Sequence, residues 1–209
     1  MTLRALFATQ VYHVSLSGKD GFTARNGAFA AWDDLKRACL SLADEDRAGI
    51  RWCRENAYPG YTSYASLDDL PLRDPVFAEL KRALDRHAAL AAQAMHLDLG
   101  RKPRLDSLWV NVLKPGGGHS GHIHPHSILS GTVYVALPDG ASPLKLEDPR
   151  LPMMMARPTL SDEAPEEARP FVYLRPQPGD LVLWESWLRH EVPPNRARSV
   201  RISVSFNYA

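Results

Sequence analysis

The sequence has few cysteines, no long apolar run and no excess of charge of either sign. Cys39 and Cys53 are the only cysteines among its 209 residues, which excludes a disulfide scaffold and a cysteine-ligated zinc site. The 25 lysines and arginines nearly equal the 24 aspartates and glutamates, whereas proteins that bind nucleic-acid phosphates normally carry a basic excess. No stretch approaches the roughly 20 apolar residues of a membrane span, and the first ten residues are too polar for a secretory signal. We therefore expect a cytoplasmic protein that binds neither nucleic acid nor membranes.

Histidine, by contrast, is concentrated in one short segment. Four of the eight histidines, namely His119, His122, His124 and His126, occupy eight consecutive positions. Even spreading of the histidines over the chain would rarely place more than one in such a window. A histidine-rich surface loop is the competing interpretation, although this cluster lies between predicted strands.

The N-terminal half predicts an opening strand and two helices. An apolar and aromatic run over residues 5–16 favours the strand. Apolar residues then recur at spacings of three and four, typical of one helix face: Phe29, Trp32, Leu35, Cys39 and Leu42. A turn-rich stretch at residues 55–64 interrupts this pattern. Asp74 and Pro75 then form a start signal for a second helix, which Gly100 is expected to end.

From about residue 105, short apolar or alternating runs replace the helical pattern. They cover residues 108–113, 128–137, 144–146, 171–174, 181–184 and 200–206, with proline- and glycine-rich turns between them. Several short strands with such turns predict a β-sandwich or barrel. We therefore predict one domain over residues 1–209, mainly β with N-terminal helices (α+β), in which residues 1–104 support a β core at residues 105–209.

One connection in the β half, Asp148–Pro170, is too long for an ordinary loop. Its proline and acidic residues predict a mobile lid or a disordered insert. From its length alone, we expect it to cover the functional site or to select the substrate.

The spacing within the histidine cluster favours a metal site. Residues two apart on a strand point to the same face, so His122 and His124 can project into one cavity. His126 has the same parity, but Pro125 is expected to end the strand before it. A metal ion held by imidazoles needs a third protein ligand, and His190, which follows a strand-like run, can supply it from a returning strand.

The last predicted strand carries a candidate anion clamp. Arg201 and Ser203 share one face of this strand by parity. A guanidinium fork with a neighbouring hydroxyl suits bidentate binding of a carboxylate. The competing interpretation is that Arg201 is an ordinary solvated strand residue.

Together these motifs resemble the 2-oxoglutarate/Fe(II)-dependent oxygenases, whose core is a double-stranded β-helix, a cupin-like jelly roll. Their motif is His-x-Asp/Glu, a distant His, and an Arg or Lys about ten residues further that binds the co-substrate carboxylate. Here these positions are His122-Ile-His124, His190 and Arg201. The resemblance implies Fe(II), 2-oxoglutarate and O2 as cofactor and co-substrates, and hydroxylation of an unidentified substrate as the reaction.

A denser set of motifs is similar to an uncharacterised bacterial family of 2-oxoglutarate/Fe(II) oxygenases. The set comprises Trp109-Val-Asn111, Pro115-Gly-Gly, His122-Ile-His-Pro125, Leu129-Ser-Gly131, Tyr134, Asp148-Pro-Arg150, Ser186-Trp-Leu-Arg-His190 and Arg201-Ile-Ser203 to Asn207. The N-terminal Tyr61-Thr-Ser63 region is also compatible with this family. A looser likeness to aspartyl/asparaginyl β-hydroxylases rests on Pro115-Gly, His122 with Pro125, and His190-Glu-Val192. By resemblance, His122, His124 and His190 are the catalytic metal ligands, and Arg201, Ser203, Asn111 and Tyr134 bind the co-substrate.

The sequence departs from the superfamily motif at one ligand. His124 occupies the position of the usual carboxylate, which makes the site more positive by one unit. Three arrangements stay open: three histidine ligands, two histidines with His124 turned away, or a carboxylate supplied by Glu185 or Asp148. We favour three histidines, because strand parity already directs His124 inward.

Two other functions compete with the oxygenase. A cupin-like three-histidine metal enzyme would not use 2-oxoglutarate, and a non-enzymatic β-barrel module would use the metal as a staple or sensor. A structural metal site tends to be closed by protein ligands, whereas this motif leaves coordination positions open. We expect a small-molecule or peptide substrate, and the exposed edges of such a barrel favour a homodimer.

Overall fold

The computed structural model describes residues 2–17, 21–22 and 28–209. The strands in that part of the chain are β1 (Val11–Ser15), β2 (Gly60–Thr62), β3 (Leu105–Leu113), β4 (His119–His122), β5 (Leu129–Ala136), β6 (Leu144–Glu147), β7 (Phe171–Leu174), β8 (Asp180–Glu185), β9 (His190–Val192) and β10 (Arg201–Tyr208). The helices are α1 (Ala28–Glu45), α2 (Arg47–Glu55), α3 (Leu70–Arg73) and α4 (Pro75–Ala94), with 3-10 turns at Leu151–Met153 and Glu166–Ala168.

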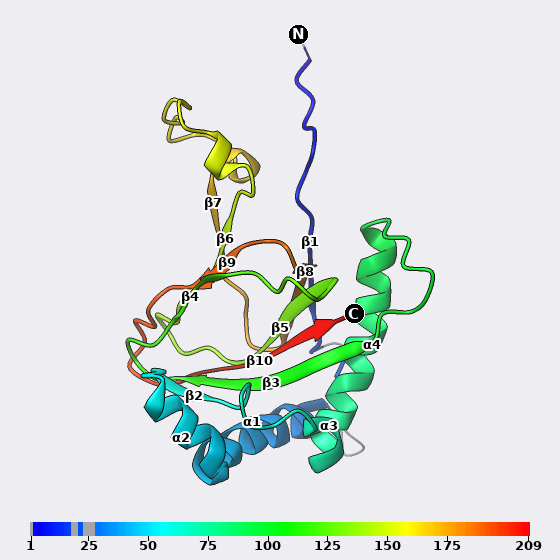
Figure 1. The fold of residues 1–209 in the computed structure, drawn as a ribbon, viewed down its shortest axis with the longest axis vertical. Helices are drawn as coiled ribbons and strands as arrows, with labels where there is room; N and C mark the ends of the chain where they lie inside the picture. Colours follow the sequence, from blue (N-terminus) through cyan, green and yellow to red (C-terminus); the bar gives the residue numbers. More distant parts are fainter. Residues whose placement is uncertain (1, 18–20, 23–27) are drawn as a thin grey trace.

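The strands form two antiparallel sheets. One has the order β1-β8-β5-β10-β3-β2 and the other the order β4-β9-β6-β7 (Figure 1). Strands distant in sequence pair directly, since β10 lies between β3 and β5, and β9 between β4 and β6. The architecture confirms the predicted mainly β jelly roll with N-terminal helices.

The helices cover the outer face of the larger sheet. In Figure 1, α1 and α2 lie beneath β2, β3 and β10, and α4 runs along the opposite end of that sheet. Leu35 and Cys39 of α1 belong to the same buried cluster as Val204 and Phe206 of β10. Burial of this apolar surface, at roughly 25 cal/mol per Å2, fixes the sheet from one side and leaves its other face for a cavity.

The helix predictions are right in type and partly wrong in extent. Asp74 caps α4 by accepting a hydrogen bond from the backbone N–H of Val76, and Pro75 is its first residue, as expected. The helix ends at Ala94 rather than near Gly100. The first predicted helix includes Phe29, whose side chain lies outside the described residues.

Every predicted run after residue 105 is a strand within three residues of its expected limits. The predicted opening strand is shorter than residues 5–16, because only Val11–Ser15 pairs with β8. The strand β2 was not expected, since its residues fall in the turn-rich stretch. It pairs with β3 through Gly60, whose φ of 148° puts it in a conformation that favours glycine.

The insert at residues 148–170 is neither a lid nor without structure. It projects from the β6–β7 hairpin away from the barrel, on the side opposite α1 and α2 (Figure 1). Its turns are tied by arginines: Arg157 donates to the carbonyl of Ala168, and Arg169 donates to that of Ala164. The expectation that it covers the histidine site is wrong, because none of its residues lines that cavity.

A helix able to span a membrane would be long and uniformly apolar, and none in the described ranges meets that requirement.

Candidate metal centre and its cavity

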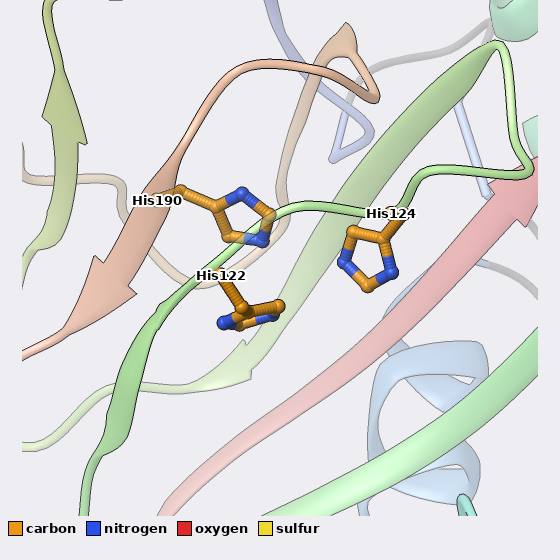
Figure 2. Close-up of side chains that lie close together, drawn as sticks. All are labelled: His122, His124 and His190. Carbon is orange, nitrogen blue, oxygen red and sulfur yellow. The ribbon is translucent and has the colours of Figure 1, made fainter.

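The structure brings three of the predicted ligands together. His122 is the last residue of β4 and His190 the first of β9, and the two residues are register partners. Their ring centroids lie 4.3 Å apart, and the ring of His124 lies 5.1 Å from the first and 5.2 Å from the second. One ligand nitrogen from each ring falls within 4.8 Å of the other two, and Figure 2 shows the rings gathered around one space.

His124 reaches this space for a reason other than the predicted strand parity. Strand β4 ends at His122, so His124 already lies in the loop that follows. Its backbone N–H donates to the carbonyl of Ser186 at 3.0 Å, which holds the loop against the segment after β8. A backbone contact with a distant segment therefore positions this ring.

Two of the three histidines have their tautomer fixed by the backbone. Nδ1 of His122 lies 2.7 Å from the carbonyl oxygen of Ser120, and Nδ1 of His190 lies 2.9 Å from that of Leu188. A carbonyl only accepts hydrogen bonds, so each Nδ1 carries the proton and each Nε2 presents a lone pair. Such an outer partner is the usual means by which proteins orient a metal-binding imidazole.

Burial keeps the imidazoles of His124 and His190 neutral, and a neutral imidazole is what metal binding requires. Burial lowers the pKa of His190 to about 3, with a further contribution from the neighbouring His122. Burial, followed by the same neighbour, lowers the pKa of His124 to about 4. Both rings are therefore deprotonated and able to donate a lone pair at neutral pH.

The other two histidines of the cluster do not join the three. His119 accepts or donates a hydrogen bond at 2.9 Å with the hydroxyl of Tyr58, and its ring lies 6.4 Å from that of His122. Burial and then the charge of Arg201 lower the pKa of His119 to about 4. His126 is exposed and does not line the cavity.

Neither alternative carboxylate lies among the ligand atoms. Asp148 pairs with Arg150 at 2.8 Å on the projecting insert. Glu185, at the end of β8, does not line the histidine cavity. Among the described residues the donor set is therefore three imidazoles, a set that suits first-row transition metals such as iron, nickel and zinc.

The three histidines open into a cavity of about 310 Å3 between the two sheets. At its inner end lies Arg201, which is only 2% exposed. Its guanidinium donates to the hydroxyl of Ser203 at 3.1 Å and lies 5.2 Å from the ring centre of Tyr134. No carboxylate among the described residues pairs with it.

This inner end contains unused hydrogen-bonding groups. Nε of Arg201 and the hydroxyl of Tyr134 are both buried without a partner. A buried cation with no anion beside it is costly, and so is each orphaned polar atom. A carboxylate bound here would supply the countercharge and the missing acceptor, so the residues fit the far end of a dicarboxylate such as 2-oxoglutarate.

The remaining predicted residues also lie in this cavity. Asn111 on β3 accepts from the hydroxyl of Tyr58 and donates to Ser205. Trp184 is 2% exposed and belongs to a buried cluster, and it also lines the cavity, with its ring 4.8 Å from that of His190.

The outer end of the cavity was missed by sequence reasoning. It is lined by four aromatic residues, three of them from the N-terminal half: Trp52, Tyr58, Tyr64 and Trp109. The available signal is the tyrosines at 58 and 64 in the turn-rich stretch 55–64, which by itself predicts only a break in the helical pattern. The N-terminal half therefore contributes to the site as well as supporting the barrel.

Residues 107–207 match the model of a family described as "Putative 2OG-Fe(II) oxygenase". This segment contains all three clustered histidines and Arg201. This match covers just under half of the chain and supports its resemblance to the 2-oxoglutarate/Fe(II)-dependent oxygenases. Together with the three-histidine cluster, it supports an enzyme that uses Fe(II) and 2-oxoglutarate, and it favours the oxygenase over the non-enzymatic module and over a cupin-like enzyme without the co-substrate.

Solved structures support the fold of this oxygenase. The epimerase SnoN from nogalamycin biosynthesis, solved with Fe3+, alpha ketoglutarate and nogalamycin RO, is 16% identical with a TM-score of 0.62, over 96% of this chain and 79% of SnoN. A Pseudomonas putida prolyl-4-hydroxylase is 15% identical with a TM-score of 0.55, over 95% of this chain and 88% of its own.

A third solved structure overlaps less. For an oxidoreductase of the 2OG-Fe(II) oxygenase family from Burkholderia pseudomallei, the match is 16% identical with a TM-score of 0.47, and it spans 64% of this chain and 57% of that one. Among curated proteins, no sequence matches this chain.

Proposed function

We propose that this oxygenase binds Fe(II) through His122, His124 and His190 and hydroxylates a C–H bond of a small-molecule or peptide substrate. The observation that carries the proposal is one cavity that holds three converging imidazoles and a buried arginine without an anion. When bound, Fe(II) would activate O2, which is the oxidant: one oxygen atom would enter succinate as 2-oxoglutarate loses CO2, and the other would enter the substrate C–H bond as a hydroxyl.

The chain's own residues bind and orient these reagents. The carbonyl oxygens of Ser120 and Leu188 hold the ring protons of His122 and His190 on Nδ1. The Nε2 lone pairs of both histidines would therefore face a bound metal ion. Arg201 and Ser203 hold the far carboxylate of 2-oxoglutarate, Tyr134 donates its free hydroxyl to it, and Asn111 borders the co-substrate. The buried strand residues around them exclude water, which strengthens each of these polar contacts.

An anaerobic titration tests the proposal. Addition of Fe(II) and then 2-oxoglutarate should produce a visible metal-to-ligand charge-transfer band, and His122→Ala and His190→Ala should each abolish stoichiometric metal binding. Iron is added anaerobically, because O2 oxidises Fe(II), and to metal-free protein, because zinc or nickel can outcompete it in a purified sample. Absence of the band, with no succinate formed from any candidate substrate, would contradict the co-substrate role. Retained metal in both variants would move the site to His119 and His126.

The expected cellular setting is part of the same proposal. We infer a cytoplasmic enzyme with no nucleic-acid or membrane partner, supported by two free, buried cysteines and balanced charge. The strands β1 and β7 are edges of the two sheets and favour pairing into a homodimer. Sedimentation of the purified chain tests the dimer, and a monomer at micromolar concentration would contradict it.

A further inference from the structure

The outer end of the cavity differs in chemistry from the inner end. Tyr64 is 61% exposed and packs edge-on against Trp109, with ring centroids 5.1 Å apart. The ring of Trp109 in turn lies 5.9 Å from that of His124. Trp52 and Tyr58, which line the same cavity, form a second, tilted pair with ring centroids 6.4 Å apart. A continuous aromatic surface therefore leads from solvent to the candidate metal ligands.

This aromatic surface carries no countercharge for an ionic substrate. None of the residues that line the cavity, all of them described, is an aspartate, glutamate or lysine. The one cation, Arg201, lies at the inner end. A charged group brought against these rings would lose hydration without gaining an oppositely charged partner.

We propose that Trp52, Tyr64 and Trp109 form a substrate-binding surface for an uncharged, planar or apolar group. This inference rests on the proposed function, because it takes the metal ligands as the reacting end of the cavity. Two of the three residues lie outside the segment that matches the oxygenase family model. The region that selects the substrate is therefore largely separate in sequence from the region that holds iron and 2-oxoglutarate.

Three ring compounds of the same shape and different charge test this proposal. Benzamide, benzoate and benzamidinium are titrated by NMR into protein loaded with Zn(II) and 2-oxoglutarate, which fills Arg201 before benzoate is added. We expect benzamide to bind at least fivefold more tightly than either ion. Tyr64→Ala and Trp52→Ala should each weaken benzamide about fivefold, the size of one aromatic contact. Trp187→Ala, at an exposed tryptophan outside the cavity, is the matched control and should change nothing.

Each other outcome overturns one specific claim. Binding of either ion as tight as that of benzamide, no measurable benzamide binding, or unchanged affinity in both aromatic variants would overturn the substrate class. Failure of the protein to take up Zn(II) or 2-oxoglutarate at all would instead overturn the proposed function.

A second inference concerns the tautomer of His124 and rests on a different observation. Its Nδ1 lies 3.4 Å from Nδ2 of Asn207, a β10 residue that is 5% exposed. In that arrangement a donor faces Nδ1, so the ring proton must reside on Nε2, and that nitrogen could not bind a metal ion. His124 thus lacks the acceptor that His122 and His190 each find in a backbone carbonyl.

Rotation of the Asn207 amide by 180° gives His124 an acceptor and keeps every other hydrogen bond. Before rotation, the amide oxygen accepts a hydrogen bond from the hydroxyl of Ser130 at 2.8 Å, and the amide nitrogen donates one to the hydroxyl of Ser107 at 3.1 Å. After rotation the nitrogen donates to Ser130 and the oxygen accepts from Ser107, because each hydroxyl can donate or accept. Ser130 remains free to donate to Ser186 at 2.8 Å.

The geometry points to Asn207 as a positioning residue for the third metal ligand. With the amide rotated, its Oδ1 accepts the Nδ1 proton of His124 and turns the Nε2 lone pair toward the ion. All three ligands then have the same tautomer, two set by backbone carbonyls and one by a side chain. This inference also rests on the proposed function, because it takes His124 as a ligand.

Metal affinity in two variants tests this positioning role. Co(II) binding is measured by chelator competition, and its visible d–d bands report the coordination. Asn207→Leu should bind Co(II) 10- to 100-fold more weakly, the usual effect of losing an outer partner, with d–d bands like those of His124→Ala. Asn207→Asp should stay within a few-fold of the parent protein, because a carboxylate oxygen also accepts from Nδ1–H. Ser107→Ala, which removes only a neighbour of the amide, is the control and should have a smaller effect.

The tautomer itself can be measured, which keeps the inference testable if Asn207→Leu does not fold. Long-range 1H–15N NMR of the Zn(II)-loaded protein should show the proton on Nδ1 in all three ligand histidines. A proton on Nε2 of His124, or equal loss of affinity in Asn207→Asp and Asn207→Leu, would overturn the inference. If His122→Ala and His190→Ala also retain metal, the proposed function fails instead.

Discussion

The two ends of the cavity differ in burial, in polarity and in origin along the chain. The inner end, with Arg201, Ser203 and Tyr134, is at most 2% exposed and comes from β5 and β10. The outer end is aromatic, reaches 61% exposure at Tyr64, and comes from α2, the turn-rich stretch 55–64 and β3. The buried, polar inner end suits the carboxylate of the co-substrate, and the more exposed, aromatic outer end suits the substrate. Changes at the two ends should therefore have separable effects.

The largest effect is expected from loss of the inner cation. Arg201→Leu keeps most of the side-chain volume but removes the charge-assisted hydrogen bonds to the far carboxylate. Such bonds are worth roughly 2–3 kcal/mol, so the KM for 2-oxoglutarate should rise about 100-fold. Steady-state succinate formation measures it, while metal stoichiometry should not change.

Two variants locate this effect at the inner end. Arg201→Lys should recover part of the affinity, because it restores the charge without the fork geometry. Tyr64→Ala should leave the KM for 2-oxoglutarate unchanged. An unchanged KM in Arg201→Leu would show that the inner end does not bind the co-substrate.

The next largest effect is expected from crowding the cavity wall at Gly131 of β5. A Cβ there would lie 2.4 Å from Cζ of Phe206 and 2.7 Å from the carbonyl oxygen of Val182. The carbonyl is backbone and cannot turn aside, so Gly131→Ala should lower the free energy of unfolding by about 1–3 kcal/mol. Chemical denaturation measures the loss. Ile123→Ala at the outer end, where the side chain is 44% exposed, should cost much less.

A moderate effect is expected at Asp46, which joins the start of α2 to the segment that carries the outer tyrosines. Asp46 accepts hydrogen bonds from the backbone N–H of Gly49 at 3.0 Å, from the hydroxyl of Tyr61 at 2.8 Å and from Ser66. It thereby caps α2 and fixes the strand between the two outer tyrosines. Asp46→Ala should lower the free energy of unfolding by about 2 kcal/mol, because it removes a cap and orphans two hydroxyls.

The pH dependence of that effect has a defined sign. Burial by itself raises the pKa of Asp46, but the hydrogen bonds from Gly49, Ser66 and Tyr61 outweigh it and leave the pKa below its usual value. A carboxyl whose pKa is lowered by folding stabilises the protein above its unfolded pKa, roughly 4, and loses that contribution as pH falls. The difference between the parent protein and Asp46→Ala should therefore shrink below about pH 4. Asp46→Asn, which keeps a good cap, should retain most of the stability.

Much of the β half could be predicted because its strands are short apolar runs between turn signals. His122 and His124 could be predicted from their two-residue spacing, and His190 from its position after a strand-like run. The break between α1 and α2 at Asp46 could not be located, because two of the three hydrogen bonds that Asp46 accepts come from Tyr61 and Ser66, which approach it only after folding. The ring of His124 was expected in the right place, but the contact that holds it there joins two distant segments.

The aromatic outer end and the projecting insert show the opposite limits of sequence analysis. The tyrosines at 58 and 64 lie among turn residues, so neither periodicity nor spacing marks them as part of a cavity. The insert was expected to cover the site because long loops often do. Its direction depends on the pairing of β6 with β7, and that pairing carries it away from the barrel.

The smallest effect is therefore expected from the insert. The backbone N–H of Asp148 donates to the carbonyl of Pro170 at 2.9 Å, so the two ends of the insert already meet as in a hairpin. Replacement of residues 149–169 by Asn-Gly should close a tight turn between β6 and β7. The KM for 2-oxoglutarate, the metal affinity and the benzamide affinity should each stay within twofold, because no deleted residue lines the histidine cavity. The same titrations measure all three, and a loss of benzamide binding alone would show that the insert reaches the outer end in solution.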